Sequence, residues 1–277
     1  MKGLRILAYH RVHPQRRGAL CVTPDELEHQ IQALLRRGAR PMSSRELLKS
    51  VTSRSGDSSA PHDAVVSSRT RWSVPPRFSQ APGFLITFDD GYADIAQHAW
   101  PVLERLGVPA VVFLIHNWVG RREPFPWEAK YVSRPGPEDL PMDWPQVRHL
   151  QSQGCEFGSH TLEHPDLLDL DPAQRRTEIA GSRQQLIDRL DADVPLFCYP
   201  RGHYSPALAE EVEEAGYRAA LLTPRRAGLP EHRYCLRRVG IYAADHGLRY
   251  RIKISPLFDL LRETRFRWTA PKPACCF

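Results

Sequence analysis

Two short motifs hold residues whose types and spacing could bind a metal ion. Residues 87–92 read Thr-Phe-Asp-Asp-Gly-Tyr, and residues 160–164 read His-Thr-Leu-Glu-His. The two histidines are four residues apart, the spacing of one helical face, so we expect them in a helical turn from which both reach one ion. One Asp and two His leave positions for water and substrate, as in catalytic metal sites. The second Asp is free to act as a base, so the pattern predicts a metal-assisted hydrolase.

Each motif follows a short apolar run, at residues 84–88 and 155–158. Taken alone, Asp-Asp-Gly is more often a turn, and two histidines at this spacing are more often structural or solvated. Their joint occurrence behind two predicted strands changes that balance, because α/β folds place their chemistry at the carboxyl ends of strands. The combination favours a metal site.

Strand and helix patterns alternate along the chain, which predicts an α/β fold. Thr23 and Glu26 form a capping box, with Pro24 at the first helical position. Strands are predicted at 4–9, 40–42, 83–88, 111–115, 155–158, 196–199, 219–222 and 239–242, and helices at 24–37, 45–51, 93–105, 144–153, 172–190 and 206–215. Such repeated units predict a parallel sheet closed into a distorted (β/α) barrel.

Length and composition agree with a single enzyme domain. The chain has 277 residues, of which 42% are hydrophobic, so it can bury a substantial core. It has no apolar run long enough for a membrane helix, and its first apolar run is too short for a signal peptide, which predicts a cytoplasmic location. The six cysteines show no Cys-x-x-Cys spacing and are interpreted as reduced thiols.

Three segments depart from the regular pattern. Residues 52–82 are rich in Ser, Pro and Arg, which is typical of a flexible insertion. Residues 116–141 contain Trp118, Trp127 and Tyr131, aromatic residues that either wall a sugar cleft or simply pack. The prediction divides the chain into a domain at 1–245 and a basic C-terminal tail or helix at 246–277.

The charge is +6, and residues 249–272 hold seven Lys or Arg. This basic segment could touch anionic lipid at the inner membrane face, or it could be a terminal helix with a solvated cationic side. A nucleic-acid partner is not expected, because no binding motif or aromatic-basic platform is recognisable.

The two motifs, in this order, resemble those of the polysaccharide deacetylases (carbohydrate esterase family 4, the NodB-homology fold). The resemblance covers residues 1–50 and 83–245, and it includes the segments 6–12, 109–114, 158–161, 197–202 and 215–220. It implies a distorted barrel of seven strands, (β/α)7. The opening Tyr9-His10-Arg11-Val12 is similar to the poly-N-acetylglucosamine deacetylase-like branch, in which the motif order is permuted.

Within this resemblance, Asp90, His160 and His164 would hold a divalent metal ion, with Zn²⁺ as the expected ion, and Asp89 would be the general base. The backbone N–H of Arg201 would stabilise the oxyanion.

Many relatives take the general acid from a late Leu-x-His motif, which this chain lacks. In the permuted branch that this chain resembles, the equivalent histidine comes from the first strand, so the resemblance implies His10 as the general acid. Its pKa is expected to be near 6.5, or higher beside Asp89. A satisfied structural histidine is the competing interpretation, and His246 is the next candidate.

Relatives also carry an arginine two residues before the proline of the third motif, where this chain has Cys198. Arg238 or Arg201 could supply the missing charge. The predicted function is metal-dependent N-deacetylation of an acetamido sugar, in a glycan or a glycan precursor. The alternatives are hydrolysis of a non-sugar C–N bond, such as a cyclic imide or ureide, and a catalytically inactive carbohydrate-binding protein.

Overall fold

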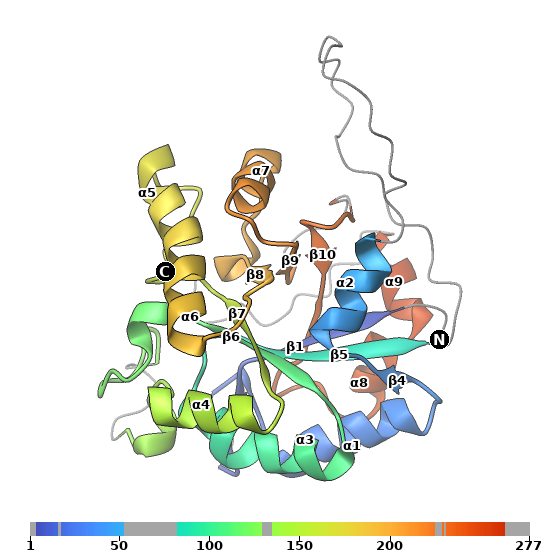
Figure 1. The fold of residues 1–277 in the computed structure, drawn as a ribbon. Coiled ribbons are helices and arrows are strands. Elements are labelled where there is room, and N and C mark those ends of the chain that lie inside the picture. The colour runs from blue at the N-terminus through green and yellow to red at the C-terminus, as the bar shows by residue number, and fades with distance from the viewer. Residues whose placement is uncertain are drawn as a thin grey trace.

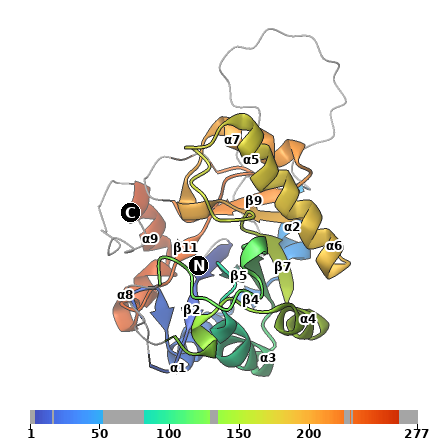
Figure 2. The same ribbon diagram turned by 90° about the vertical axis from the view of Figure 1, so that its left-hand side faces the viewer.

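The fold is a parallel barrel surrounded by helices, as the alternating pattern predicted (Figures 1 and 2). The computed structural model describes residues 4–15, 18–52, 82–128, 135–224, 229 and 231–263. The predicted insertion at 52–82 therefore lies almost wholly outside the described residues. Within the described residues, the main sheet has nine strands in the order β10-β9-β8-β7-β6-β5-β1-β11, with β4 paired to β5. Its strands are β1 (Arg5–Tyr9), β4 (Arg40–Pro41), β5 (Gly83–Phe88), β6 (Ala110–Leu114), β7 (Glu156–Ser159), β8 (Leu196–Cys198), β9 (Ala219–Leu222), β10 (Leu236–Arg237) and β11 (Val239–Gly240).

The barrel closes through one short segment at residues 236–240. β10 pairs with β9 at one end of the sheet, and β11 pairs with β1 at the other. Arg238 is the single residue between them, and its N–H donates to Leu222 O at 2.8 Å. The segment thus acts as the seventh barrel strand and changes partner at Arg238. The predicted strand at 239–242 is shorter than expected because pairing to β1 ends at Gly240.

Side chains of the barrel strands alternate between two apolar layers. One layer fills the barrel and includes Ile6, Leu85 and Phe113. Residues of helix α2 (Ser44–Thr52) belong to the same layer, so α2 covers the amino-terminal end of the barrel. The other layer packs under the surrounding helices. The described cysteines, at 21, 155, 198 and 235, are buried thiols, in agreement with the prediction.

The helices form a ring around the strands (Figure 2). They are α1 (Pro24–Leu35), α2, α3 (Trp100–Leu106), α4 (Trp144–Ser152), α5 (Pro172–Arg176), α6 (Ser182–Leu190), α7 (Pro206–Glu214), α8 (Gly247–Lys253) and α9 (Pro256–Glu263). The predicted capping box of α1 is confirmed, with Glu26 N donating to Thr23 Oγ1 at 3.2 Å.

Two predicted helices contain a π-helical turn. The helix predicted at 172–190 consists of α5, a π turn at Thr177–Gly181 and α6, which form one column in Figure 1. The helix predicted at 93–105 likewise includes a π turn, at Ile95–Ala99, before α3. Such turns insert an extra residue and often occur at functional sites.

Outside the main sheet, β2 (Arg11–Val12) and β3 (Cys21–Val22) form a two-stranded parallel ladder just after the end of β1. This ladder fixes the backbone directly after His10.

The described part of the predicted C-terminal tail packs against the barrel. Tyr250 Oη of α8 donates to Gln30 O at 2.9 Å, and Arg5 Nη1 donates to Asp259 Oδ1 of α9 at 2.8 Å. Lys253 is buried and donates to Gly240 O at 2.8 Å.

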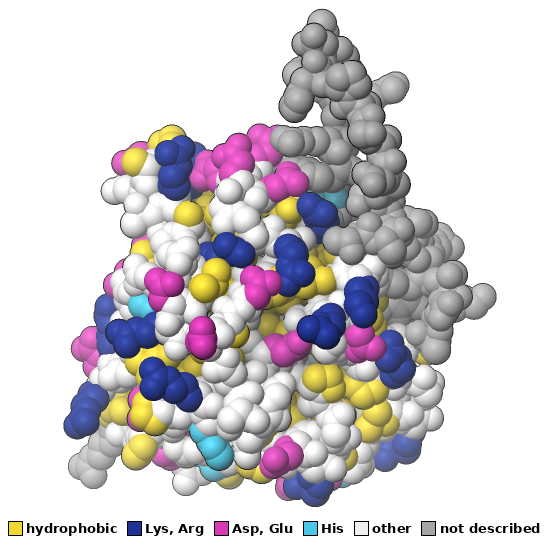
Figure 3. Space-filling model, viewed as in Figure 1, with side chains coloured by type: hydrophobic (Ala, Val, Ile, Leu, Met, Phe, Trp, Pro, Cys, Tyr) yellow, Lys and Arg dark blue, Asp and Glu magenta, His cyan; other side chains and the backbone are white. Residues whose placement is uncertain are grey.

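Basic and acidic side chains are interspersed on the face shown in Figure 3. Within the part of the chain that the structure describes, no helix is both long and apolar enough to span a membrane.

Candidate metal-dependent active site

The Asp-Asp-Gly turn follows β5 and separates its two carboxylates. β5 runs beside β1, and Asp89 N donates to Tyr9 O at 3.0 Å. Asp90 and Gly91 then adopt left-handed conformations, with φ of 69° and 82°. Glycine is required at 91 because a Cβ there would lie 2.6 Å from Leu114 Cδ2. The sharp turn directs the two neighbouring carboxylates to different partners.

The two histidines of the second motif lie in a loop, so the predicted helical turn is wrong. Thr161 and His164 have φ of 71° and 62°, which a right-handed helix does not allow. The loop is held by its own side chains, because His164 N donates to Thr161 Oγ1 at 2.9 Å. Glu178, in the π turn between α5 and α6, accepts the N–H groups of residues 162–163 at 2.9 and 3.1 Å. The left-handed backbone conformation of this loop, and not a helical repeat, brings the two imidazole rings together.

The side chains of Asp90, His160 and His164 converge on one point. Asp90 Oδ1 lies 3.7 Å from His160 Nε2 and 3.9 Å from His164 Nε2. The three ligand atoms all lie within 4.8 Å of one another. Cys198 O contacts His160 Nδ1 at 2.8 Å, so the Nε2 lone pair of a neutral ring faces Asp90.

The protonation states suit a cation at this point. Burial lowers the pKa of His160 to about 4 and lowers that of His164 well below its usual value, so both rings are neutral near pH 7. Burial and the neighbouring Asp89 raise the pKa of Asp90, which a cation would reverse. One carboxylate and two neutral imidazoles are donors that Zn²⁺ accepts, so these residues fit the predicted ion.

Asp89 is held by Arg238. Arg238 Nη1 and Nη2 donate to Asp89 Oδ1 and Oδ2, each at 2.6 Å, and Nη1 also contacts Thr87 Oγ1 at 3.1 Å. Burial alone would raise the pKa of Asp89, but the Arg238 charge and its hydrogen bonds outweigh burial and lower it. Of the two candidates for this charge, Arg238 makes the contact.

Relatives carry an arginine at the position of Cys198. The small Cys198 side chain explains how Arg238, from another strand, can replace that arginine here. Its thiol is fully buried at the end of β8, and Sγ lies 3.0 Å from Arg238 Nη2 and 3.7 Å from Asp89 Oδ1. Burial raises the pKa of this thiol, so it is protonated near pH 7. The small neutral side chain leaves room for the Arg238 guanidinium inside the barrel.

His10 lies on the same rim, directly after β1. Its Nε2 is 3.8 Å from Asp89 Oδ2. The expected pKa of 6.5 or higher is contradicted. Burial lowers the pKa of His10, and this effect is larger than the opposite effect of the Asp89 charge. His246, the second candidate, is the exposed residue before α8, the helix that contacts α1 through Tyr250.

Arg201 follows Pro200 in a tight turn after β8. Its φ is 58°, and the next residue, Gly202, has φ of 66°. A Cβ at Gly202 would lie 2.2 Å from Thr223 O, so the turn admits only glycine there. The Arg201 charge is one cause of the lowered His164 pKa, after burial and the neighbouring His160.

Strained backbone collects around this site. Among the described residues, five residues other than glycine have positive φ, and four of them are Asp90, Thr161, His164 and Arg201. Such conformations cost about 1–3 kcal/mol each and occur most often at functional sites. Their position agrees with the metal-site interpretation.

One aromatic side chain that the sequence left undecided lies at the site. The Trp127 ring is half-buried, and its centroid is 4.8 Å from that of His164. Trp118 is buried, and Tyr131 lies outside the described residues. Pattern alone could not separate Trp127 from Trp118, because both occur in the same irregular, proline-rich segment.

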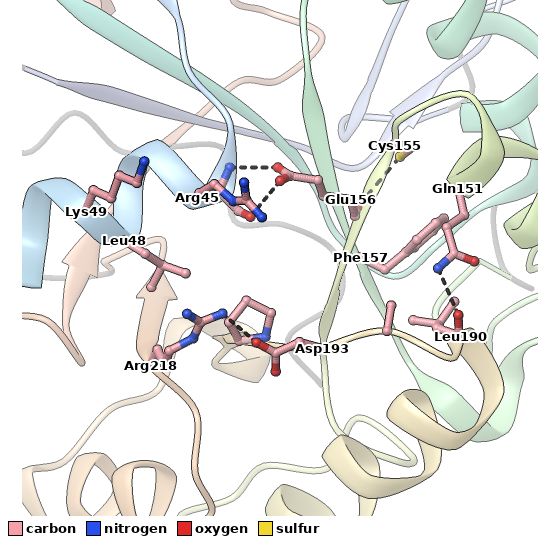
Figure 4. A pocket seen from close by; sticks show the side chains of 13 residues that line it. Arg45, Leu48, Lys49, Gln151, Cys155, Glu156, Phe157, Leu190, Asp193 and Arg218 are labelled. Atoms are coloured by element: carbon pink, nitrogen blue, oxygen red, sulfur yellow. Dashed lines mark hydrogen bonds and ion pairs between the residues drawn. The ribbon is translucent and has the colours of Figure 1, made fainter.

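A cavity of about 530 Å³ lies at the other end of the barrel (Figure 4). It is lined by α2 and by the segments that precede β7, β8 and β9, including Glu156, Asp193 and Arg218. These charges are engaged locally, since Ser44 N donates to Glu156 and Arg218 to Asp193. The aspartates and histidines of the candidate active site follow the carboxyl ends of the strands, so this cavity is separate from the candidate active site.

Sequence comparisons find a matching family and a related protein. The family model described as polysaccharide deacetylase matches residues 79–220. The Bacillus subtilis (strain 168) protein YxkH, named as a polysaccharide deacetylase, is 30% identical over 158 residues. That match covers 57% of this chain and 50% of YxkH, so the chain spans half the length of this relative.

Solved structures share the whole fold at low sequence identity. The Streptococcus pyogenes deacetylase PplD in complex with acetate has a TM-score of 0.69 at 20% identity, over 92% of this chain and 99% of that one. IcaB from Ammonifex degensii gives 0.62 at 23% identity, over 87% and 92%. A de-N-acetylase from Aggregatibacter actinomycetemcomitans gives 0.66 at 16% identity, over 91% and 99%. These similarities support the predicted (β/α)7 barrel.

Proposed function

The chain belongs to the polysaccharide deacetylase family, and we propose that it is a metal-dependent hydrolase that removes N-acetyl groups from an acetamido sugar in a glycan or glycan precursor. The observation that carries the proposal is the convergence of Asp90, His160 and His164 beside an Asp89 that Arg238 holds in its ionised form. The names of the structural relatives, a deacetylase with acetate and a de-N-acetylase, support this choice of substrate class.

In this proposal, Asp90, His160 and His164 hold the ion, expected to be Zn²⁺. When bound, it would activate a water molecule and polarise the acetyl carbonyl group. Asp89 accepts a proton from the attacking water, since Arg238 keeps its carboxylate ionised at neutral pH. The N–H of Arg201 donates to the oxygen that becomes negative in the tetrahedral intermediate.

His10 is proposed as the general acid for the departing nitrogen. Because its pKa is lowered, His10 is neutral before the reaction, and the proton that it delivers must be one released during the reaction. Asp89 Oδ2 lies 3.8 Å from His10 Nε2, so a small movement would let the proton from water pass between them. One proton then leaves the water and one reaches the amine, which balances the hydrolysis.

Metal content and acetate release test this proposal together. His160→Ala and His164→Ala are expected to lose stoichiometric metal and hydrolysis of N-acetylated sugars. Asp89→Asn is expected to keep the metal and lose about two to four orders of magnitude in turnover, the usual scale for a general base. His149→Ala, an exposed histidine of α4, is the matched control. Full activity of a variant without bound metal would refute the mechanism, and exchanged results for Asp89 and Asp90 would exchange their roles.

Contact with an anionic membrane is proposed only for the basic segment at residues 249–272. Lys253 is buried, Arg249 pairs with Asp245 at 2.8 Å, and Arg251 is exposed. Cosedimentation with acidic liposomes at low salt, and release as salt rises, would support it. If equal amounts of protein cosediment with neutral and acidic vesicles, the segment is a helix with a solvated cationic side and does not bind anionic lipid. The predicted cytoplasmic location stays a prediction.

A further inference from the structure

The opening Tyr-His-Arg-Val segment also carries an arginine that the proposed reaction does not use. Arg11 is fully buried in β2. Its guanidinium donates to Asp94 Oδ2 at 2.8 Å, to Asp139 Oδ1 at 2.6 Å and to Glu128 Oε2 at 3.2 Å. One cation therefore joins three carboxylates from two other parts of the chain, namely the turn after β5 and the connection between β6 and α4.

Glu128 extends this cluster to the active site. Its second oxygen, Oε1, accepts the Tyr92 hydroxyl at 3.1 Å, and the same hydroxyl accepts Trp127 Nε1–H at 2.8 Å. The Trp127 ring then lies beside the metal-site residue His164, at 4.8 Å between centroids. An unbroken chain of contacts runs from Arg11 through Glu128 and Tyr92 to an indole at the site.

Stability alone gives little reason for this arrangement. A buried ion cluster loses the hydration of every member, and apolar residues of similar volume often stabilise a core as well or better. The hydrogen bonds do fix geometry, however. They set the direction of the Trp127 N–H, and Phe125 stacks on one indole face at 4.9 Å and 7° between planes. A ligand would contact this half-buried ring on its other face or at its edges.

We propose that Arg11 and Tyr92 are positioning residues that hold Trp127 beside His164 as a stacking surface for the pyranose ring of the substrate. The proposal rests on the acetamido-sugar function proposed above. Aromatic rings offer large, rigid apolar faces, which suit the C–H face of a sugar, and a ring fixed in advance loses little entropy on binding. The ring beside a metal ligand would place the sugar while its acetamido group reaches the ion.

Binding to the metal-free protein tests the stacking surface without any turnover. Oligomers of N-acetylglucosamine, β-1,4- and β-1,6-linked, are titrated by calorimetry into the chelator-treated protein. Trp127→Ala is expected to weaken binding about tenfold, the effect of losing burial against one aromatic face. Tyr92→Phe is expected to weaken it about threefold to tenfold, because the indole loses its hydrogen-bonded anchor. Tyr250→Phe, which removes a buried hydroxyl on α8, is the matched control and should bind normally.

A double-mutant cycle tests whether Tyr92 acts through the indole. Trp127→Phe keeps an aromatic face but has no N–H for Tyr92 to accept, so adding Tyr92→Phe should change affinity no further. In the metal-loaded enzyme, Tyr92→Phe should raise KM for the oligomer more than it raises KM for an aryl acetate, because the aryl acetate has no pyranose ring to stack on Trp127. Arg11→Met removes the cation from three buried carboxylates and risks unfolding, so the conclusion rests on the Tyr92 and Trp127 variants.

The outcomes separate this proposal from the function on which it rests. If the unmodified metal-free protein binds no oligomer, both the acetamido-sugar function and the stacking surface are refuted. If it binds but Trp127→Ala binds equally well, only the stacking surface is refuted. An undiminished Tyr92→Phe effect in the Trp127→Phe background would refute the positioning role.

Discussion

Replacing Arg238 by Met should change the ionisation of Asp89, the proposed general base, without removing a metal ion from the proposed site. Arg238 gives Asp89 both of its short hydrogen bonds, and both side chains are almost fully buried. The metal-site residues Asp90, His160 and His164 lie outside this pair, so metal content should remain stoichiometric. With the guanidinium gone, burial acts on Asp89 alone and raises its pKa above the usual value.

The magnitude follows from removing one partner of a buried ion pair. Such a change costs about 3–5 kcal/mol when the other charge stays buried and ionised. In the native protein the Asp89 pKa is lowered, so its contribution is present above the unfolded pKa of about 4 and is lost as pH falls below it. In Arg238→Met the folded pKa is raised, so stability is instead lost as pH rises from about 4 toward that new pKa.

Two assays report this change. Urea unfolding of the metal-free protein at pH 7.5 and pH 5 should show a larger loss for Arg238→Met at the higher pH. In the loaded enzyme, the acidic limb of kcat/KM should move to higher pH, while Arg238→Lys should give an intermediate shift because it keeps the charge but not the paired geometry. Arg237→Met removes the same charge from a partly exposed pair with Glu231 and serves as the control.

An unchanged acidic limb in an Arg238→Met protein that keeps its metal would refute this account. It would mean that Arg238 does not set the ionisation of Asp89. Loss of the metal in the same variant would also contradict it, since Arg238 would then support the ion site itself.

Three further changes have expected outcomes. His10→Ala should keep the metal, slow amide substrates strongly and slow activated aryl acetates much less, because a good leaving group needs no proton. Burial lowers the pKa of His232 to about 4, so its folded form stays neutral while the unfolded ring gains a proton below about 6.5. In the metal-free protein, His232 should therefore account for about 2 kcal/mol of the unfolding free energy that is lost between pH 7.5 and pH 5, and His232→Gln should lose that much less than wild type. Gly202→Ala should destabilise the protein by about 2 kcal/mol or more in urea unfolding, because its Cβ would meet Thr223 O in a left-handed turn.

Each of these changes has a control and a contradicting result. Equal losses on amides and aryl acetates would make His10 a structural residue and His246 the next position to test. A His232→Gln protein with the pH dependence of wild type would show that His232 is not the group that titrates. Gly38→Ala has the same left-handed backbone but nothing within 4 Å of the added Cβ, so it isolates the Thr223 contact. Equal stability of the two alanine variants would refute the steric argument.

Local sequence determined the elements and the residue types of the proposed metal site. The capping box at Thr23 and the apolar runs before Asp89 and His160 depend on residues a few positions apart, so each can be recognised without the rest of the chain. Repeated strand–helix units then dictate a parallel barrel, and a parallel barrel places all carboxyl ends on one rim. For this reason the set of Asp90, His160 and His164 could be predicted together.

Spacing failed where the loop is shaped by distant residues. The histidine pair looked helical, but Glu178 and the left-handed residues Thr161 and His164 form an irregular loop instead. The spacing of residues along a sequence shows only whether that segment could form a regular helix or strand. It does not show that Glu178, a residue of another element, accepts hydrogen bonds from the N–H groups of this loop.

Tertiary structure alone decided which residue binds Asp89 and which aromatic side chain lies beside the candidate site. Arg238 and Asp89 are 149 residues apart, and their contact exists because strand pairing changes from β9 to β1 at Arg238 and closes the barrel. The low pKa of His10 has a similar origin, since desolvation depends on what the fold packs around a ring. The contacts that link Arg11 to Trp127 join three separate parts of the chain. The sequence shows the type and charge of each residue directly. The burial of a residue and its partners from distant parts of the chain are known only when the barrel has closed.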